Sequence, residues 1–367
     1  MRIALVHDDF VQAGGAESLF ATIASIWKDA PIYTSLVNWD KLPSVIDRSR
    51  VRSSFMQKIP FAARFYKLFL PLYPLAFESF NLDDFDLVIS STTRFAKSIL
   101  TKPKTIHVCY INSIPRFLWD EKIQKDYLQS PFRVLLRPIM NWLKKWDKVA
   151  AKRVDRYIAN SQNVRQSVAK IYGIDSQVVY PFADLDFFKP AKIHNWKLKS
   201  QNYFLIVSRL VKWKKIDCAI EAANDSEVNL KIVGIGSDKG RLKKIVSSKQ
   251  IEFLGKVPKE QLRQLYQNCQ ALIITQEEDF GISALEAQAC GRPVIAYQKG
   301  GVGEIVKDGQ TGILFNTQSK EMLKDAIQTL SRLKWSVQAC RKNALKFSKA
   351  NFIEELKNKI KNHAANS

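Results

Sequence analysis

Short apolar segments alternate with helical patterns along almost the whole of this 367-residue chain, and this alternation constrains its fold most strongly. Strands that alternate with helices predict βαβ units and parallel sheets. Four segments of the first half have the character of buried strands, with helical segments such as 16–28 and 134–153 between them: 2–7, 86–90, 105–112 and 156–161. A second series of strands follows at 203–210, 230–236, 251–255, 271–275 and 292–297. We therefore expect an α/β protein with two doubly wound domains.

The boundary between these domains is expected near 178–190, VVYPFADLDFFKP, because prolines and aspartates interrupt the pattern there. The expected domains are residues 1–183 and 184–345. The remaining segment, 346–367, is expected to form a C-terminal helix that packs back toward the first domain. Ligands of doubly wound sheets bind beyond the carboxyl ends of the strands, so the cleft between two such domains is the expected site.

The chain carries 57 lysines and arginines against 35 aspartates and glutamates, which gives a formal net charge of +22. This surplus suits nucleic acid, an anionic membrane surface or phosphate-bearing substrates, and charge alone does not separate these partners. The N-terminal MRIALVHDD has too short an apolar run for a signal peptide. No segment reaches the roughly 18–20 unbroken apolar residues that span a bilayer. We expect a soluble or peripheral protein.

The five cysteines show no CxxC or metal-ligand spacing and stand mostly inside apolar runs. They are expected to be reduced core residues of a cytosolic protein. The four histidines leave little material for a zinc site. Asp83, Asp84 and Asp86 precede a strand in the pattern of a solvated turn. Composition therefore gives no sign of a bound metal.

The segment 276–305, QEEDFGISALEAQACGRPVIAYQKGGVGEI, follows a predicted strand and carries the densest set of candidate site residues. A helix that begins near Ile282 would present free backbone N–H groups and its dipole to phosphate oxygens, and Gly281 permits close backbone approach. Glu278 can accept hydrogen bonds from sugar hydroxyls, and Glu286 can accept both hydroxyls of a ribose. The two carboxylates alone would also suit a solvated loop and helix, but the glycine turns that follow favour a ligand site.

These motifs resemble the retaining GT-B glycosyltransferases of family GT4. The family pattern runs E-x-F-G-x-x-x-x-E-A, C-G-x-P-V-I-A, G-G-x-x-E and G-x-x-G, and all four pieces stand here in order at 278–287, 290–296, 300–304 and 309–312. The resemblance implies two Rossmann-like domains that face a central cleft. It also implies transfer of a sugar from a nucleotide diphosphate sugar, with no bound metal and no other cofactor.

The resemblance extends to donor-site residues along most of the chain. SRLVKWKK at 208–215 matches the family's R-L-x-x-x-K, which implies that Arg209 and Lys214 hold the pyrophosphate. Lys215 stands where the family usually has glycine. Together with Glu278, which the resemblance assigns to orienting the donor sugar, Arg209 and Lys214 are the expected catalytic residues. The implied donor-binding residues are Gly14, Gly15, Gly234, Val257, Phe280, Gly281, Ile282 and Glu286.

The first half resembles more narrowly the bacterial mannosyltransferases that build O-antigen and similar surface polysaccharides, through segments 71–80, 85–97, 110–120 and 157–173. This implies mannose from GDP-mannose, and a lipid-linked or polysaccharide acceptor in cell-surface glycan biosynthesis. Where that subgroup has histidine in Y-x-H-T-P-x-R, this chain has Asn112. Asparagine keeps a hydrogen bond but cannot act as a base. Another donor, such as UDP-glucose, UDP-GlcNAc or a dTDP-sugar, remains open.

Polar residues at strand ends of the first half are candidates for the acceptor side: His7, Asp8, Ser91, Lys97, Asn112 and Arg116. Asp8 and Asp9 either supply a base for the acceptor hydroxyl or cap a turn. For Ser91, Lys97 and Arg116, a structural role stands beside the acceptor role.

The segment 49–77, SRVRSSFMQKIPFAARFYKLFLPLYPLAF, mixes cations with aromatic residues, which suits a helix in an anionic membrane surface. The basic cluster 137–153 could extend this face. The alternative is that the aromatics are core and the cations are solvated. A polyprenyl-diphosphate acceptor lies in the membrane plane, so the expected location is peripheral, on the inner face of the cytoplasmic membrane.

Two other function classes fit the sequence less well. An oxidoreductase would need G-x-G-x-x-G near the first strand, and VQAGGAES lacks that spacing. A basic nucleic-acid-binding protein would suit the charge, but no recognition motif is present in the sequence. Retention of Glu278, Glu286, Arg209 and Lys214 argues against a catalytically inactive relative.

Overall fold

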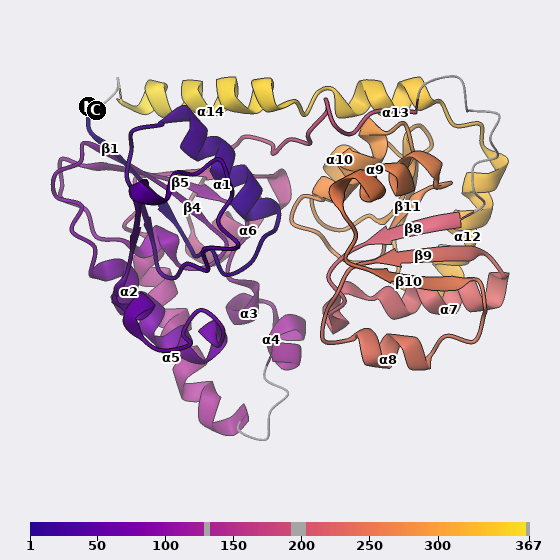
Figure 1. Ribbon diagram of the computed structural model, residues 1–367, viewed down its shortest axis with the longest axis horizontal. Coiled ribbons are helices and arrows are strands. Elements are labelled where there is room, and N and C mark those ends of the chain that lie inside the picture. The colour runs from indigo at the N-terminus through magenta and orange to yellow at the C-terminus, as the bar shows by residue number, and fades with distance from the viewer. Residues whose placement is uncertain (128–132, 192–202, 365–367) are drawn as a thin grey trace. The chain divides into compact units, whose positions relative to one another are not determined.

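The computed structural model describes residues 1–127, 133–191 and 203–364. The chain divides into two compact units (Figure 1). Unit 1 contains Met1–Tyr180 together with the chain from Ile353 on, and unit 2 is Pro181–Phe352. The C-terminal helix α14 (Lys349–Ala364) therefore begins in unit 2 and continues in unit 1.

Unit 1 is built on a parallel sheet in which seven strands are described, in the order β3-β2-β1-β4-β5-β6-β7. Four of them match the predicted strands: β1 (Ile3–His7), β4 (Leu87–Thr92), β5 (Ile106–Ile111) and β6 (Arg156–Ala159). The other three were not predicted: β2 (Ile32–Thr34), β3 (Val51–Ser53) and β7 (Gln177–Val178). Each is two or three residues long, which is too short to show a period-2 pattern.

The helices of unit 1 connect these strands and cover the sheet (Figure 1). They are α1 (Gly15–Ile26), α2 (Tyr73–Glu78), α3 (Arg116–Trp119), α4 (Glu121–Tyr127), α5 (Arg133–Ala151) and α6 (Gln162–Tyr172). Short 3-10 turns lie at η1 (Arg48–Arg50), η2 (Phe55–Lys58), η3 (Tyr66–Leu72) and η4 (Ala96–Ser98). The predicted helices at 16–28 and 134–153 correspond to α1 and α5.

The prediction of a helix along 49–77 is wrong, because this segment contains β3, η2, η3 and most of α2. Several of its apolar residues belong to the core of unit 1, where Met56, Leu70, Tyr73 and Phe77 are buried in one cluster. Others face solvent: Phe61 and Leu68 are 73% and 77% exposed. The segment is therefore part of the fold of unit 1, and its exposed residues Phe61 and Leu68 add an apolar surface that faces solvent.

Unit 2 is built on a second parallel sheet, whose six described strands have the order β10-β9-β8-β11-β12-β13. Five strands match the predicted ones: β8 (Tyr203–Val207), β9 (Asn229–Val233), β10 (Ile251–Gly255), β11 (Leu272–Ile274) and β12 (Val294–Tyr297). The sixth, β13 (Gly312–Phe315), was recognised only as part of a glycine motif. The two doubly wound sheets confirm the predicted fold class.

Helices lie on both faces of this sheet, and Figure 1 shows α9 and α10 on the opposite side from α7. Phe204 and Ile206 of β8 pack in one apolar cluster with Ile220 of α7 and Leu323 of α12. The helices of unit 2 are α7 (Ile216–Ser226), α8 (Lys239–Lys244), α9 (Lys259–Asn268), α10 (Ile282–Ala289), α11 (Val302–Ile305), α12 (Lys320–Arg332) and α13 (Val337–Ala344). Burial on both faces explains why these strands are continuous apolar runs.

All five cysteines are buried and none forms a disulfide, as predicted for core thiols. None of the described helices combines the length and the apolarity that crossing a bilayer requires.

Candidate active site

The strand order of unit 2 reverses between β8 and β11: β9 and β10 lie to one side, and β12 and β13 to the other. Such a switch point leaves room for a ligand beyond the carboxyl ends of the strands, because the connections diverge there. The predicted donor residues of unit 2 follow these strand ends: Arg209 and Lys214 after β8, Gly234 after β9, Val257 after β10, and Glu278, Phe280, Gly281 and Ile282 after β11. The fold therefore brings them to one edge of one sheet.

The loop after β8 presents two cations of different exposure. Arg209 is exposed, and within the described part of the chain its side chain makes no hydrogen bond or ion pair. Lys214 is buried, and its Nζ lies 2.6 Å from Oε1 of Glu278 and 4.4 Å from the ring centroid of Trp213. Glu278 also accepts a hydrogen bond from Gln276. The ammonium of Lys214 and the carboxylate of Glu278 are thus paired across the switch point, and the loop that carries Lys214 also carries the exposed Arg209.

The glycine segment after β9 lets the loop that carries Arg209 lie close. A Cβ on Gly234, whose φ is +140°, would lie 1.8 Å from the carbonyl oxygen of Ser208. Backbone hydrogen bonds continue this contact, since Leu210 N donates to Ile235 O at 3.0 Å. A side chain at Gly234 would push the two loops apart.

The first residues of α10 face the same edge. Gly281 adopts φ +107° and caps the helix, and Ile282 is its first residue. Phe280 is buried, with its ring centroid 5.9 Å from that of Phe347. Because the Phe280 side chain belongs to the core, only the backbone of Phe280 is placed for the predicted contact with the donor. Free N–H groups at this helix N-terminus are suited to a phosphate.

Glu286 lies on the second turn of α10 and is half-buried. Its Oε2 accepts a hydrogen bond of 2.8 Å from the hydroxyl of Tyr266 on α9. Burial raises the pKa of Glu286 to about 7, while Tyr266 and Lys259 oppose that shift. Sequence reasoning missed Tyr266, which stands twenty residues before its partner.

Two other motif residues, Gly301 and Val257, also lie near the carboxyl ends of the strands of unit 2. Gly301 N donates to the carbonyl oxygen of Glu278 at 2.8 Å, and this bond ties the loops after β11 and β12 together. Val257, predicted to lie near the nucleotide base, is half-buried and stands two residues beyond β10.

Unit 1 has the same reversal of strand order, between β1 and β4. His7 ends β1, and its Nδ1 lies 3.1 Å from the carbonyl oxygen of Ser91, while its ring stacks on Phe20 at 4.5 Å. Asn112, just after β5, donates from Nδ2 to Oγ of Ser91 at 3.0 Å. His7, Ser91 and Asn112 are buried, so the structure brings these three predicted acceptor residues into one polar row.

The structure assigns Asp8 to the turn-capping alternative rather than to the base role. Its carboxylate is buried and accepts backbone hydrogen bonds from the loop after β4, at Thr93, Arg94, Phe95 and Ala96. Burial opposes ionisation of this group, but Arg94, His7 and the backbone donors outweigh it and hold the pKa of Asp8 below its usual value. A carboxylate with so many donors is a poor proton acceptor.

Lys97 has a structural role, because its ammonium is fully buried and forms an ion pair with Asp147 of α5 at 2.6 Å. The other oxygen of Asp147 accepts from Trp119 at 2.8 Å and from Tyr172 at 2.7 Å. The acceptor role predicted for Lys97 is therefore not supported. A lysine after a strand end carries no sequence signal that separates a buried pair from a ligand contact.

Arg116 is half-buried, and Gly14 and Gly15 are exposed. Arg116 begins α3 and pairs with Asp120 at 3.1 Å. Gly14 precedes α1 and donates its N–H to Oε2 of Glu17 at 2.8 Å, and Gly15 opens the helix. Arg116 thus lies at the start of the helix that follows β5, and Gly14 and Gly15 lie at the start of the helix that follows β1.

Two family models match the chain, one in each half. The model of Glycosyl transferases group 1 matches residues 189–347, and that of Glycosyltransferase Family 4 matches residues 13–187. Each half of the chain therefore carries a glycosyltransferase domain, of the Family 4 type in the first half and of the group 1 type in the second. Both models describe glycosyltransferases, in agreement with the predicted class of enzyme.

Curated relatives of this glycosyltransferase are distant. An uncharacterized glycosyltransferase of Methanocaldococcus jannaschii is 27% identical over 80% of this chain and 76% of its own length. A second from the same organism is 29% identical over 53% of each chain. The D-inositol 3-phosphate glycosyltransferase of Rhodococcus jostii is 29% identical over 48% of this chain and 44% of its own. The chain thus spans about half the length of the last two relatives.

Solved structures show the same fold. Sucrose-phosphate synthase from Thermosynechococcus elongatus superposes with a TM-score of 0.77 at 18% identity and covers 100% of both chains. Anabaena HepE in complex with UDP-glucose gives a TM-score of 0.70 at 19% identity, over 99% of this chain and 100% of that one. At these identities the likeness establishes the GT-B architecture.

A polar cluster of this glycosyltransferase that the sequence did not single out surrounds Arg94, two residues beyond β4. Arg94 donates to Oδ2 of Asp9, which also accepts from the hydroxyl of Tyr73 at 3.2 Å. The guanidinium lies 5.6 Å from the ring centroid of Tyr66. Its position just past a strand end was the signal that could have identified it.

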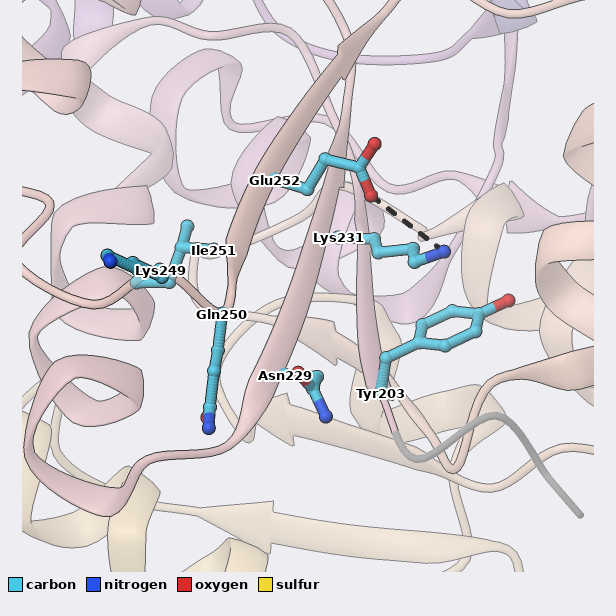
Figure 2. Close-up of a pocket in the computed structure, with 7 residues that line it drawn as sticks. All are labelled: Tyr203, Asn229, Lys231, Lys249, Gln250, Ile251 and Glu252. Carbon is cyan, nitrogen blue, oxygen red and sulfur yellow. Dashed lines mark ion pairs between the residues drawn. The ribbon is translucent and has the colours of Figure 1, made fainter.

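Figure 2 shows a pocket of unit 2 that lies at the amino ends of three strands, whereas the predicted donor residues follow the carboxyl ends. Lys231 lies there 3.8 Å from Glu252 and 4.6 Å from the ring centroid of Tyr203. The pocket is formed at the amino ends of β8, β9 and β10 and is lined by Tyr203, Asn229, Lys231, Lys249, Gln250, Ile251 and Glu252. Since ligands of such sheets bind at the carboxyl ends, it is not the candidate donor site.

Within residues 1–127, 133–191 and 203–364, no group of three or more His, Cys, Asp or Glu side chains is arranged to hold a metal ion.

Proposed function

We propose that this glycosyltransferase moves a hexose from a nucleotide diphosphate sugar to a hydroxyl of a lipid-linked or polysaccharide acceptor, with retention at the anomeric carbon. The observation that carries the proposal is the edge at the β8/β11 switch point. There the exposed Arg209 and the buried Lys214 stand on the loop after β8, Lys214 pairs with Glu278 of the loop after β11, and α10 begins at the same edge. Cations suit a pyrophosphate, and carboxylates suit hydroxyls.

In the proposed reaction, the bond between the anomeric carbon and the diphosphate oxygen breaks. A bond from that carbon to the acceptor oxygen forms on the same face, and the acceptor proton passes to the departing phosphate. Charge develops on the diphosphate, where Arg209 and Lys214 would stabilise it as preorganised donors. Lys214 has three N–H donors, so it can hold Glu278 and a phosphate oxygen together.

The pair also supports a role for Glu278 in orienting the sugar. Its Oε1 accepts hydrogen bonds from Lys214 and Gln276, and these contacts hold the carboxylate in one orientation. A sugar hydroxyl would then donate to this oriented carboxylate. Glu286, farther along α10, would accept the hydroxyls of the ribose.

We propose that transfer needs no divalent cation, because Arg209, Lys214 and the first N–H groups of α10 would supply positive potential along the diphosphate. Activity that persists in excess EDTA is the expected result.

The best candidate donor is GDP-mannose, on the resemblance of the first half to bacterial mannosyltransferases. Asn112 in place of the subgroup's histidine keeps UDP-glucose, UDP-GlcNAc and dTDP-sugars as alternatives. Anabaena HepE, which shares the fold, was solved with UDP-glucose, so UDP donors belong in any panel.

We propose that the acceptor is presented at the inner face of the cytoplasmic membrane. The exposed side chains Phe61, Phe65 and Leu68 stand beside Arg64 and Lys67 in the sequence, and the Arg64 guanidinium lies 5.5 Å from the Phe65 ring centroid. Apolar groups next to cations suit an anionic interface.

The test is product formation from polyprenyl-diphosphate-linked glycans and a panel of nucleotide sugars in EDTA, with the anomeric configuration of the product assigned by NMR. Formation of a glycoside with the donor's own configuration supports the proposal. An inverted product contradicts the retaining mechanism, and turnover that is restored only by a divalent cation contradicts metal independence.

A further inference from the structure

The side chain of Tyr266 lies against the carboxylate that the proposed function assigns to the ribose. Tyr266 is completely buried on α9, and its hydroxyl donates to Oε2 of Glu286 at 2.8 Å. This bond leaves Oε1 of Glu286 and one lone pair of Oε2 for a ligand.

Packing fixes the Tyr266 ring in place. The ring lies edge-on to Phe188, with centroids 5.7 Å apart and an interplanar angle of 82°. The backbone around Phe188 is held in turn by Arg341 of α13, whose Nη1 donates to the carbonyl oxygens of Phe188 at 2.7 Å and of Ala289, the last residue of α10, at 3.0 Å. The tyrosine hydroxyl therefore has a defined position from which to orient Glu286.

We propose that Tyr266 is a positioning residue for donor binding, because its hydroxyl holds Glu286 in the orientation that accepts the ribose hydroxyls of a nucleoside diphosphate. This inference rests on the proposed function. Tyr266 acts through Glu286 and not by contact with the reacting atoms.

The electrostatics of the site give the inference a distinctive signature. Burial raises the pKa of Glu286 to about 7, and Tyr266 and Lys259 of α9 oppose this shift, whereas Asp184 adds to it. Arg341 is the cation that α13 brings to the end of α10. Ribose hydroxyls donate better to a carboxylate than to a carboxylic acid, so affinity should fall as the pH drops below about 7. Loss of the tyrosine hydroxyl should raise the pKa of Glu286 further and move this fall to higher pH.

The experiment measures the affinity of the purified full chain for GDP, UDP and inorganic pyrophosphate by calorimetry from pH 6 to pH 9. Tyr266→Phe removes the hydroxyl. The matched control is Tyr203→Phe, because Tyr203 is also buried and its hydroxyl donates at 2.8 Å to the backbone of Leu265, the neighbour of Tyr266. Both variants lose one buried hydrogen bond, but only one of those bonds reaches Glu286.

We expect Tyr266→Phe to weaken the nucleoside diphosphate that the wild type binds by about tenfold at pH 7, with a smaller loss at pH 9. Pyrophosphate affinity should be unchanged in both variants, and Tyr203→Phe should bind as the wild type does. Glu286→Gln provides a second line of evidence that does not depend on Tyr266→Phe folding. It should bind the nucleoside diphosphate with little change across this pH range.

Equal affinities of Tyr266→Phe and Tyr203→Phe at every pH would overturn the inference and leave the proposed function intact. A Glu286→Gln variant that keeps the pH dependence of the wild type would also overturn the inference and leave the proposed function intact. If the wild type binds neither nucleoside diphosphate, the proposed function fails first, and the role of Tyr266 fails with it.

Discussion

Lys215 occupies a backbone position that ordinary side chains avoid. Its φ is +52°, in the left-handed region, between the 3-10 turn η6 (Lys212–Lys214) and α7. Family GT4 usually has glycine at this position. The backbone conformation explains that preference, since glycine adopts a positive φ without a Cβ clash. The chain keeps the turn that places Lys214 although it has lost the residue best suited to make it.

Lys215→Gly should therefore raise the free energy of unfolding by about 0.5–1 kcal/mol, because relief of the left-handed strain exceeds the extra chain entropy of glycine. Urea denaturation measures the change. The control is Lys212→Gly in the same turn, which has no such strain to relieve and should lower stability. A stability loss in Lys215→Gly would show that the strain is negligible.

Arg209 should matter for turnover and not for folding. Arg209→Ala is expected to lower kcat by about 100- to 1000-fold, the effect typical of removing one preorganised donor. Its melting temperature should stay unchanged because the side chain is exposed. Lys212→Ala, a change to another exposed cation of the same segment, is the control and should retain activity. Wild-type turnover in Arg209→Ala would remove the phosphate assignment.

At the scale of elements, the loop after β4 shows where prediction from sequence succeeds and where it stops. The strand itself and the polar character of the loop were predictable from the alternating pattern. The structural roles of Asp8 and Lys97 were not predictable from the sequence. A polar residue after a strand has the same sequence context whether it binds a ligand or forms a buried contact within the protein. Only the distant partner decides the role: Asp147 stands fifty residues from Lys97.

The buried pair of Lys97 and Asp147 should be essential to unit 1. Asp147→Asn would leave the Lys97 ammonium buried without a counter-charge, at a cost of about 3–5 kcal/mol of unfolding free energy. Asp175→Asn, which breaks the largely exposed pair with Arg165, is the control, and its midpoint should not shift measurably. Equal midpoints of the two variants would mean that the buried pair contributes no net stability.

At the scale of the whole molecule, both sheets and most of their strands followed from the alternation of apolar runs and helical patterns. The unpredicted strands were short, and the predicted helix at 49–77 was wrong because composition does not reveal which aromatics are core. The common position of the predicted donor residues at one sheet edge was predictable, since each of their motifs follows a strand. Tyr266 and Arg94 were not, because they belong to no motif and act through contacts that only the fold creates.

The exposed apolar surface of unit 1 should bind anionic membranes. The double variant Phe61→Ser, Leu68→Ser should weaken binding to vesicles of phosphatidylglycerol and phosphatidylethanolamine at least tenfold, because both side chains are largely exposed and free to insert. Val45→Ser, at a 71% exposed residue outside segment 49–77, should bind as the wild type does. Unchanged binding of the double variant in a sedimentation assay would exclude this surface.

Binding of a nucleotide sugar without a metal is best measured by calorimetric titration of the wild-type protein with GDP-mannose, UDP-glucose, UDP-GlcNAc and dTDP-rhamnose, with and without excess EDTA. We expect selective binding of one donor, with the same affinity in both conditions, because Arg209 and Lys214 would supply the positive charge at the diphosphate. Binding of none of the donors, or binding that EDTA abolishes, would contradict this expectation.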